Sequence, residues 1–185
     1  MVTSILDIDL DYFNLVSDPI RALSEMLAWA NRPVDVLADN HADAMRRWVK
    51  LVASGKLSFP THILHADEHH DMMDQKTTIN VANVMCHAMS RWPRCRVYWM
   101  VEDSIDTPAM WLDDDVWNRL RTRFRMGTQR PQKWPVPEFL SVTISADFLR
   151  PNLKDALMDE IMRREKKWSN RRSHHTVAPR RGNVR

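Results

Sequence analysis

Short apolar segments rich in β-branched residues recur along the chain and alternate with segments of helical periodicity. The apolar segments cover residues 2–10, 34–38, 62–66, 96–101 and 140–145, and each has the length and composition of a buried strand. Apolar positions three and four residues apart predict helices at residues 20–30, 44–51, 81–89 and 111–120, with a last helix over about 152–167. Strands that alternate with helices are typical of a parallel sheet covered on both faces.

The pattern therefore predicts an α/β fold, a three-layer αβα sandwich whose mostly parallel sheet has about five or more strands. Local signals support the helices: Asp18 is a capping acid before Pro19 at the first helical position, and Gly55 follows the second predicted helix. A Pro-rich loop is expected at residues 127–137.

Length and composition indicate one folded domain followed by a tail. The chain has 185 residues, of which 44% are hydrophobic and 28% charged, values typical of a globular domain. From about Ser169 the sequence is basic and nearly without apolar residues, so it cannot offset its ordering entropy. We expect a folded domain over residues 1–168 and a basic, disordered tail over 169–185.

Charge is divided unevenly between these two parts. The net charge is +3, but residues 163–185 carry +8, so the remaining 162 residues carry −5. An acidic body argues against a nucleic-acid-binding surface and favours cationic ligands. Two cysteines, no signal-peptide pattern and no apolar run of about 20 residues predict a cytoplasmic protein without a membrane span.

Acids and histidines follow the predicted strands. In a parallel sheet the carboxyl ends of the strands lie at one edge, where ligands bind. These ends carry Asp7, Asp9 and Asp11; Asp39 and His41; Asp67, His69, His70 and Asp71; Glu102 and Asp103; and Asp147. Neighbouring carboxylates at ~4 Å repel by about 4 kcal/mol per pair at an effective dielectric constant near 20, so such a cluster needs protons or cations.

Six of these residues form a set of oxygen and nitrogen donors. The six are Asp7, Asp9, His41, Asp67, His69 and Asp71. Six donors are too many for one tetrahedral zinc ion and suit two divalent ions with octahedral preferences, such as Mn²⁺. Two such ions can polarise one shared water.

Three segments resemble a known superfamily. Residues 67–71 resemble the Asp-x-His-x-Asp metal loop of the arginases and related ureohydrolases, and residues 4–11 resemble their Asp-x-Asp motif. The segments LDIDLDYF, NHADAM and HADEHHDM together resemble a small arginase-like family that includes the peptide arginases of ribosomal peptide natural-product pathways. The likeness spans about residues 3–150.

The resemblance implies an abbreviated arginase-like fold with two Mn²⁺ ions. It implies that Asp67 and Asp7 bridge the ions, that His41 and Asp71 complete one ion, and that His69 and Asp9 complete the other. The implied reaction converts peptidyl arginine to ornithine and urea in an Arg-containing precursor peptide. Here the Asp-x-Asp motif precedes the metal loop, whereas ordinary arginases have the reverse order, and the short chain predicts a shallow site suited to a peptide.

Such a reaction also needs a group that holds the guanidinium and a group that transfers a proton. A carboxylate can hold the guanidinium through paired hydrogen bonds, and Glu102, Asp103 and Asp147 are the candidates because they follow neighbouring strands. The candidate proton shuttles are His87, His70 and His65. His65 is also expected to support a metal ligand, and Asp11 is expected to cap a helix or turn.

Two other functional classes stay open. The strand that ends in Asp7-x-Asp9 also resembles the nucleophile motif of haloacid-dehalogenase-type phosphatases, although that leaves the His-rich loop without a role. The chain can also be a non-catalytic binding protein that uses a metal as a structural staple. A one-zinc deacetylase is a minor variant. The sequence leaves the oligomeric state open.

Overall fold

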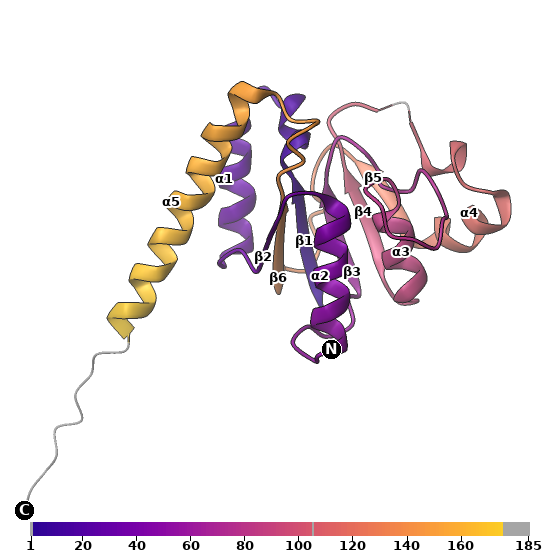
Figure 1. The fold of residues 1–185 in the computed structure, drawn as a ribbon, viewed down its shortest axis with the longest axis horizontal. Coiled ribbons are helices and arrows are strands. Elements are labelled where there is room, and N and C mark those ends of the chain that lie inside the picture. The colour runs from indigo at the N-terminus through magenta and orange to yellow at the C-terminus, as the bar shows by residue number, and fades with distance from the viewer. Residues whose placement is uncertain (1, 105, 176–185) are drawn as a thin grey trace, which may run out of the picture.

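The computed structural model describes residues 2–104 and 106–175, with side chains up to residue 170. Six parallel strands form one sheet in the order β2-β6-β1-β3-β4-β5 (Figure 1). The strands are β1 (Ser4–Asp9), β2 (Val36–Ala38), β3 (His62–Ala66), β4 (Arg96–Met100), β5 (Phe124–Gly127) and β6 (Phe139–Thr143). The predicted α/β class and parallel sheet are confirmed.

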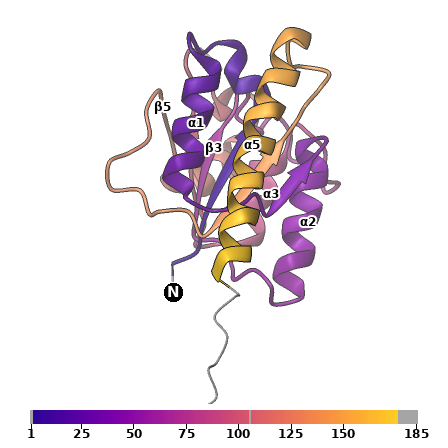
Figure 2. The same cartoon turned by 90° about the vertical axis from the view of Figure 1, so that its left-hand side faces the viewer.

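Helices cover both faces of this sheet, an arrangement compatible with a three-layer sandwich (Figures 1 and 2). They are α1 (Pro19–Ala30), α2 (His41–Ala53), α3 (Val84–Arg91), α4 (Asp114–Leu120) and α5 (Pro151–His175), with 3-10 turns η1 (Leu10–Asn14), η2 (Pro108–Met110) and η3 (Arg121–Arg123). One buried cluster lies beneath α2 and α3, and the other lies beneath α1 and α5.

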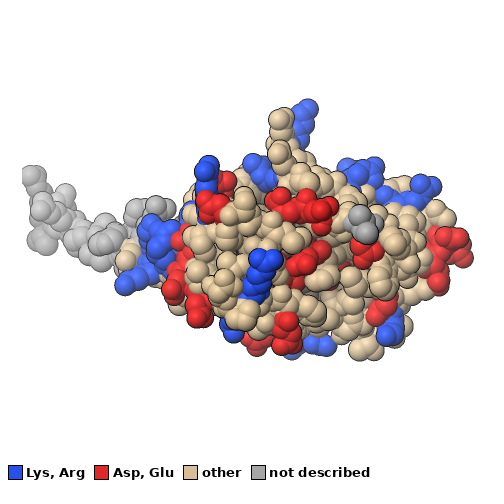
Figure 3. Space-filling view, turned by 90° about the horizontal axis from the view of Figure 1, so that it is seen from above, with Lys and Arg blue, Asp and Glu red and all other residues tan. Residues whose placement is uncertain are grey.

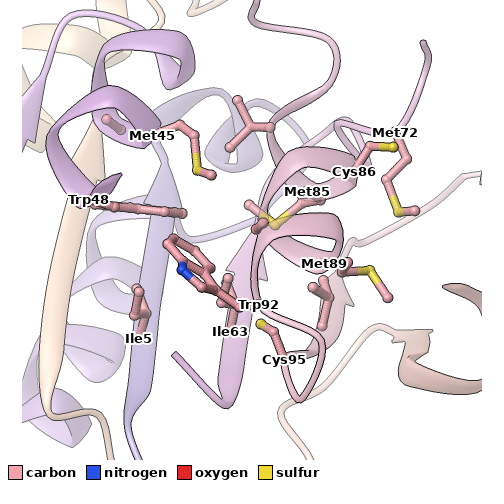
Figure 4. Packing of buried hydrophobic residues seen from close by; sticks show 14 of the residues in the cluster. Ile5, Met45, Trp48, Ile63, Met72, Met85, Cys86, Met89, Trp92 and Cys95 are labelled. Atoms are coloured by element: carbon pink, nitrogen blue, oxygen red, sulfur yellow. The ribbon is translucent and has the colours of Figure 1, made fainter. Parts of the chain in front are cut away.

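Alternating residues of the central strand reach the two clusters. Ile5 of β1 packs with Trp48 of α2 and Met85 of α3 (Figure 4). Leu6 packs on the opposite face with Leu27 of α1. Because side chains alternate along a strand, Asp7 and Asp9 share the face of Ile5, which α2 covers.

The local helix signals act as the sequence predicts. The Asp18 side chain accepts a hydrogen bond from the Arg21 N–H, and Pro19 opens α1. Asn40 caps α2 in the same way, so His41 is the first residue of that helix. Gly55 follows α2 with a φ of 71°, in the left-handed region that glycine enters without strain.

Two elements differ from the sequence prediction. β5 is an additional strand at the sheet edge, next to the predicted Pro-rich loop. The last helix, α5, continues to His175 and thus includes the first part of the predicted tail. Residues 176–185 of that tail lie outside the described residues. Among the helices that are described, none has the length and apolar character needed to cross a membrane.

Candidate metal centre

The side chains at the carboxyl end of β1 meet the first residue of α2. His41 Nε2 lies 3.2 Å from Asp7 Oδ2, and His41 Nδ1 lies 3.1 Å from Asp9 Oδ2. All three side chains are buried. The amino end of a helix carries partial positive charge, which favours carboxylates at this position.

The loop after β3 brings two more carboxylates to the same imidazole. Asp67 Oδ2 lies 3.1 Å and Asp71 Oδ2 lies 2.9 Å from His41 Nδ1. Together with Asp9, three carboxylate oxygens surround one nitrogen, which carries at most one hydrogen. This arrangement has more acceptors than donors.

Three polar atoms of this cluster make no hydrogen bond among the described residues, because the short distances to their neighbours do not have hydrogen-bond geometry. They are Asp7 Oδ1, His41 Nε2 and Asp71 Oδ2, and all three are buried. Buried polar atoms are normally hydrogen-bonded or bound to a cation. The donor set, carboxylate oxygens with imidazole nitrogens, fits a divalent metal ion.

Backbone conformation is unusual at two residues of the site. Asp71 has a φ of 50° and Ser145 a φ of 44°, both in the left-handed region that non-glycine residues rarely adopt. The Asp71 carbonyl accepts a 3.0 Å hydrogen bond from Met85 N–H, and the Ser145 hydroxyl donates a 2.5 Å hydrogen bond to Asp9 Oδ2. Such conformations persist where the surrounding structure holds them, often at functional sites.

A second group lies on the solvent side of Asp67. His69 Nδ1 is 3.3 Å from Asp11 Oδ2 and 3.6 Å from Asp67 Oδ1. The His69 ring contacts Phe148, with ring centroids 5.7 Å apart. The side chain of His69 is 36% exposed, whereas Asp11 and Asp67 are buried. His69 therefore lies at the mouth of the site.

Asp11 does not cap the turn, contrary to the sequence expectation. Asp9 caps η1 instead, since its side chain accepts a 3.1 Å hydrogen bond from Asp11 N–H. The Asp11 side chain faces the loop after β3, where Oδ1 accepts a 3.4 Å hydrogen bond from Glu68 N–H. The only sequence signal for its place in the site is its spacing of two residues from Asp9.

These side chains line a cavity of about 160 Å³ at the carboxyl edge of the sheet. Its lining residues are Asp9, Asp11, His41, Asp67, His69, Asp71, Met73, Val81, Ala82, Ser145 and Phe148. Acidic side chains gather near the middle of this face of the molecule (Figure 3). The cavity thus joins an acidic floor to a partly apolar rim.

The environment shifts the pKa of each buried acid in the cluster. Burial raises the pKa of Asp9, and the charges of Asp67 and Asp11 raise it further, so it lies well above its usual value despite the attraction of His41. Burial also raises the pKa of Asp71. The neutral forms of these two acids are therefore favoured while no cation is bound.

The imidazoles respond in the opposite sense. Burial lowers the pKa of His41, but the charges of Asp7, Asp9 and Asp71 outweigh it and raise the pKa well above the usual value. The pKa of His65 is also raised by nearby aspartates despite its burial. Protons on these rings balance the acids, and a divalent cation would displace them.

His65 contacts two of the carboxylates, and its predicted supporting role stays a prediction. His65 Nδ1 is 2.9 Å from Asp7 Oδ2, while Nε2 is 3.2 Å from the His69 carbonyl oxygen and from Asp67 Oδ2. Contacts of this kind orient metal ligands. Burial raises the pKa of Asp7, but the nearby His41 and His65 outweigh that effect and lower it.

The three predicted guanidinium clamps, Asp147, Glu102 and Asp103, are exposed. None of them lines the cavity, although Asp147 directly precedes Phe148, which does. Glu102 Oε1 accepts a 3.0 Å hydrogen bond from the Tyr12 hydroxyl. The structure therefore does not place any of these three beside the metal cluster, and their assignment stays a prediction.

The two other predicted proton shuttles also lie outside the cavity. His70 is buried against Trp99, its Nδ1 accepts a 3.0 Å hydrogen bond from Met72 N–H, and burial lowers its pKa to about 4. His87 is half-buried in α3, and its Nε2 has no hydrogen-bond partner among the described residues. The structure brings together the six predicted metal ligands rather than these catalytic candidates.

Comparisons of the chain with protein-family models, curated proteins and solved structures found no match.

Proposed function

We propose that the chain is a hydrolase dependent on two Mn²⁺ ions that converts peptidyl arginine to ornithine and urea in a ribosomally made precursor peptide. The observation that carries this proposal is the convergence of Asp9, Asp67 and Asp71 on one nitrogen of His41, within 3.1 Å. Such a group of buried carboxylates is stable only with protons or cations. The resemblance to peptide arginases supplies the substrate and the reaction.

The residues present fit two cations better than one. Asp67 Oδ2 faces His41 and His65, whereas Asp67 Oδ1 faces His69. Asp67 is thus placed between two groups of donors, as a bridging ligand must be. The proposed ligand set is Asp7, Asp9, His41, Asp67, His69 and Asp71. Oxygen donors with two imidazoles suit Mn²⁺.

When bound, two divalent ions lower the pKa of a shared water, so that a nucleophile exists near neutral pH. In the net reaction one water adds to the guanidinium carbon and the bond from that carbon to the side-chain nitrogen breaks. The peptide keeps an ammonium group and urea leaves, so atoms and charge balance. The acidic floor of the cavity favours the guanidinium cation over neutral side chains.

The rim of the cavity suits the apolar part of an arginine side chain. Met73, Val81 and Phe148 line it, and Val81 and Phe148 are 42% and 56% exposed. An arginine carries three methylene groups, which pack on apolar surface while the charged end reaches polar groups.

The direct test combines purified protein, Mn²⁺ and an Arg-containing precursor peptide. Mass spectrometry should show that the peptide mass falls by about 42 Da for each converted residue, which is the difference between arginine and ornithine when hydrolysis releases urea. Asp67→Asn should abolish the product, whereas Asp39→Asn, an exposed carboxylate at the end of β2, should retain it. Protein that binds two Mn²⁺ ions and leaves every arginine unchanged at stoichiometric concentration would refute the reaction.

The structure gives less support to the phosphatase alternative. Asp7, the nucleophile in that interpretation, is fully buried and does not line the cavity. Its Oδ2 is 2.9 Å from His65 Nδ1. A metal-stapled binding protein has the same cluster, and the peptide assay separates it from the hydrolase because it would bind metal without turnover.

A further inference from the structure

Asp11 belongs to the solvent side of the metal cluster, where the arginase resemblance assigns no role to it. Its side chain is 2% exposed and lines the cavity. Oδ2 lies 3.3 Å from His69 Nδ1, and Oδ1 is directed to Glu68 N–H by a hydrogen bond. Asp11 therefore presents a buried carboxylate oxygen beside a predicted metal ligand.

The carboxylates that the resemblance pairs with His69 lie on the other side of Asp67. Asp9 Oδ2 contacts His41 Nδ1 and accepts the hydrogen bond of Ser145. Asp7 contacts His41 and His65 and does not line the cavity. Among the described residues, the carboxylates near His69 Nδ1 are Asp11 at 3.3 Å and Asp67 at 3.6 Å.

We propose that Asp11 binds the outer of the two cations together with Asp67 and His69, in the place that the resemblance assigns to Asp9. One ligand atom from each of these three residues lies within 4.8 Å of the others. Two ligands on opposite sides of a divalent ion of this size are about 4–5 Å apart, so one ion can contact all three. Asp9 then serves the inner ion with His41.

A different role for Asp11 is to orient the His69 ring by accepting its N–H hydrogen bond. Loss of such a supporting partner typically weakens metal binding by about 10–100-fold. Asp11→Asn separates the two roles, because the Asn amide oxygen still accepts that hydrogen bond but lacks the negative charge of a carboxylate ligand.

The experiment titrates metal-free protein with Mn²⁺ alone by calorimetry and counts the ions that remain after desalting. We expect two ions in the unmodified protein. Asp11→Asn should retain one ion with unchanged affinity and bind the other more than about 100-fold more weakly. Asp39→Asn, the exposed control, should bind both ions normally. Unchanged binding, or a weakening of less than about 100-fold, would mean that the Asp11 carboxylate is not a ligand and at most orients His69; either result overturns the proposal.

Two further variants test the contact directly. Asp11→Cys places a soft thiolate at the same position, so Cd²⁺ should restore the second ion at least tenfold better than Mn²⁺. His69→Ala should remove the same ion as Asp11→Asn, and the double variant should bind no worse than either single variant. The assignment would be contradicted if the two substitutions weakened metal binding independently, so that their effects multiplied in the double variant. It would also be contradicted if Cd²⁺ did not restore binding to an Asp11→Cys protein with a normal circular dichroism spectrum.

This inference rests on the two-ion part of the proposed function and not on the arginine reaction. If the protein binds two ions as described but leaves arginine peptides unchanged, the reaction is wrong and the role of Asp11 stands. If unmodified protein binds only one Mn²⁺ ion, the role of Asp11 at an outer ion is wrong.

Discussion

Replacing Asp9 with Asn should have opposite effects on the metal-free and the metal-loaded protein. Asp9 and Asp67 each have an oxygen 3.1 Å from His41 Nδ1. These oxygens are therefore at most about 6 Å apart, and their charges repel by about 3 kcal/mol at an effective dielectric constant near 20. The substitution keeps the shape of the side chain and removes this repulsion.

Other contacts of Asp9 offset part of that gain. Burial raises its pKa, the charge of His41 lowers it, and Asp67 and Asp11 raise it again, with a net value well above normal. A neutral side chain therefore suits the metal-free site. Loss of the charged acceptor for Ser145 costs about 1 kcal/mol. In the metal-free protein, we expect the free energy of unfolding to stay unchanged or to rise by up to about 2 kcal/mol.

With Mn²⁺ bound, the unmodified protein should become more stable than the Asp9→Asn variant. At a concentration 100 times Kd, one bound ion adds about 2.7 kcal/mol of stability, which raises the melting temperature of a chain of this size by about 5–10 °C. The Asp9→Asn variant should lack this rise in melting temperature for at least one ion. Urea unfolding and thermal melting at pH 8, with Mn²⁺ and with a chelator, measure both states. A variant that loses more than about 2 kcal/mol without metal and keeps the full Mn²⁺ effect would refute the reasoning.

Three other predictions follow from the structure. Hydrogen bonds to Asp11 and Asp67 raise the pKa of His69 from 6.5 to about 11, so the stabilisation from its proton is complete below pH 6.5 and is lost as pH rises toward 11. The melting temperature of the metal-free protein should fall from pH 7 to 10 while the Mn²⁺ affinity rises, and a flat profile would contradict this. The buried Asn83 side chain donates a 2.7 Å hydrogen bond to Asp74 Oδ1. Asn83→Ala should lower the free energy of unfolding, measured by urea titration, by about 2–3 kcal/mol. Substitutions at neutral surface positions usually change it by less than about 0.5 kcal/mol. Phe148→Ala should raise KM for an Arg peptide about fivefold with little change in kcat, because a cation–π contact with the ring contributes about 1 kcal/mol to binding. An equal rise in KM after substitution of the remote Phe59 would contradict this explanation.

The fold was predictable where burial alone decides the structure. Strands β1 and β3 are buried on both faces, so adjacent apolar residues such as Ile5 and Leu6 or Ile63 and Leu64 mark them in the sequence. Strand β5 was missed because it lies at the sheet edge, where Arg125 and Met126 are exposed and only Phe124 is fully buried. Its conformation depends on pairing with β4, which lies far away in the sequence.

The prediction that side chains at the strand ends converge holds for the six candidate metal ligands, whereas the three candidate clamps do not line the cavity. Asp67 and Asp71 lie in one short loop whose backbone holds them together. Asp147 and Glu102 follow their strands in the same way, but the loops after β6 and β4 leave them exposed. Sequence position places a residue near the sheet edge without fixing the direction of its side chain.

Local periodicity and burial were enough to predict the alternation of strands and helices, the parallel sheet and the types of side chain at its carboxyl edge. The pairing of each carboxylate with an imidazole depends on contacts between distant segments, which local patterns do not specify. Strand order sets β1 between β3 and β6, which brings Asp9, Asp67 and Ser145 together from distant parts of the chain. The turn η1 after Asp9 breaks the alternation of the strand, and it directs Asp11 to His69, a contact that spacing alone does not predict.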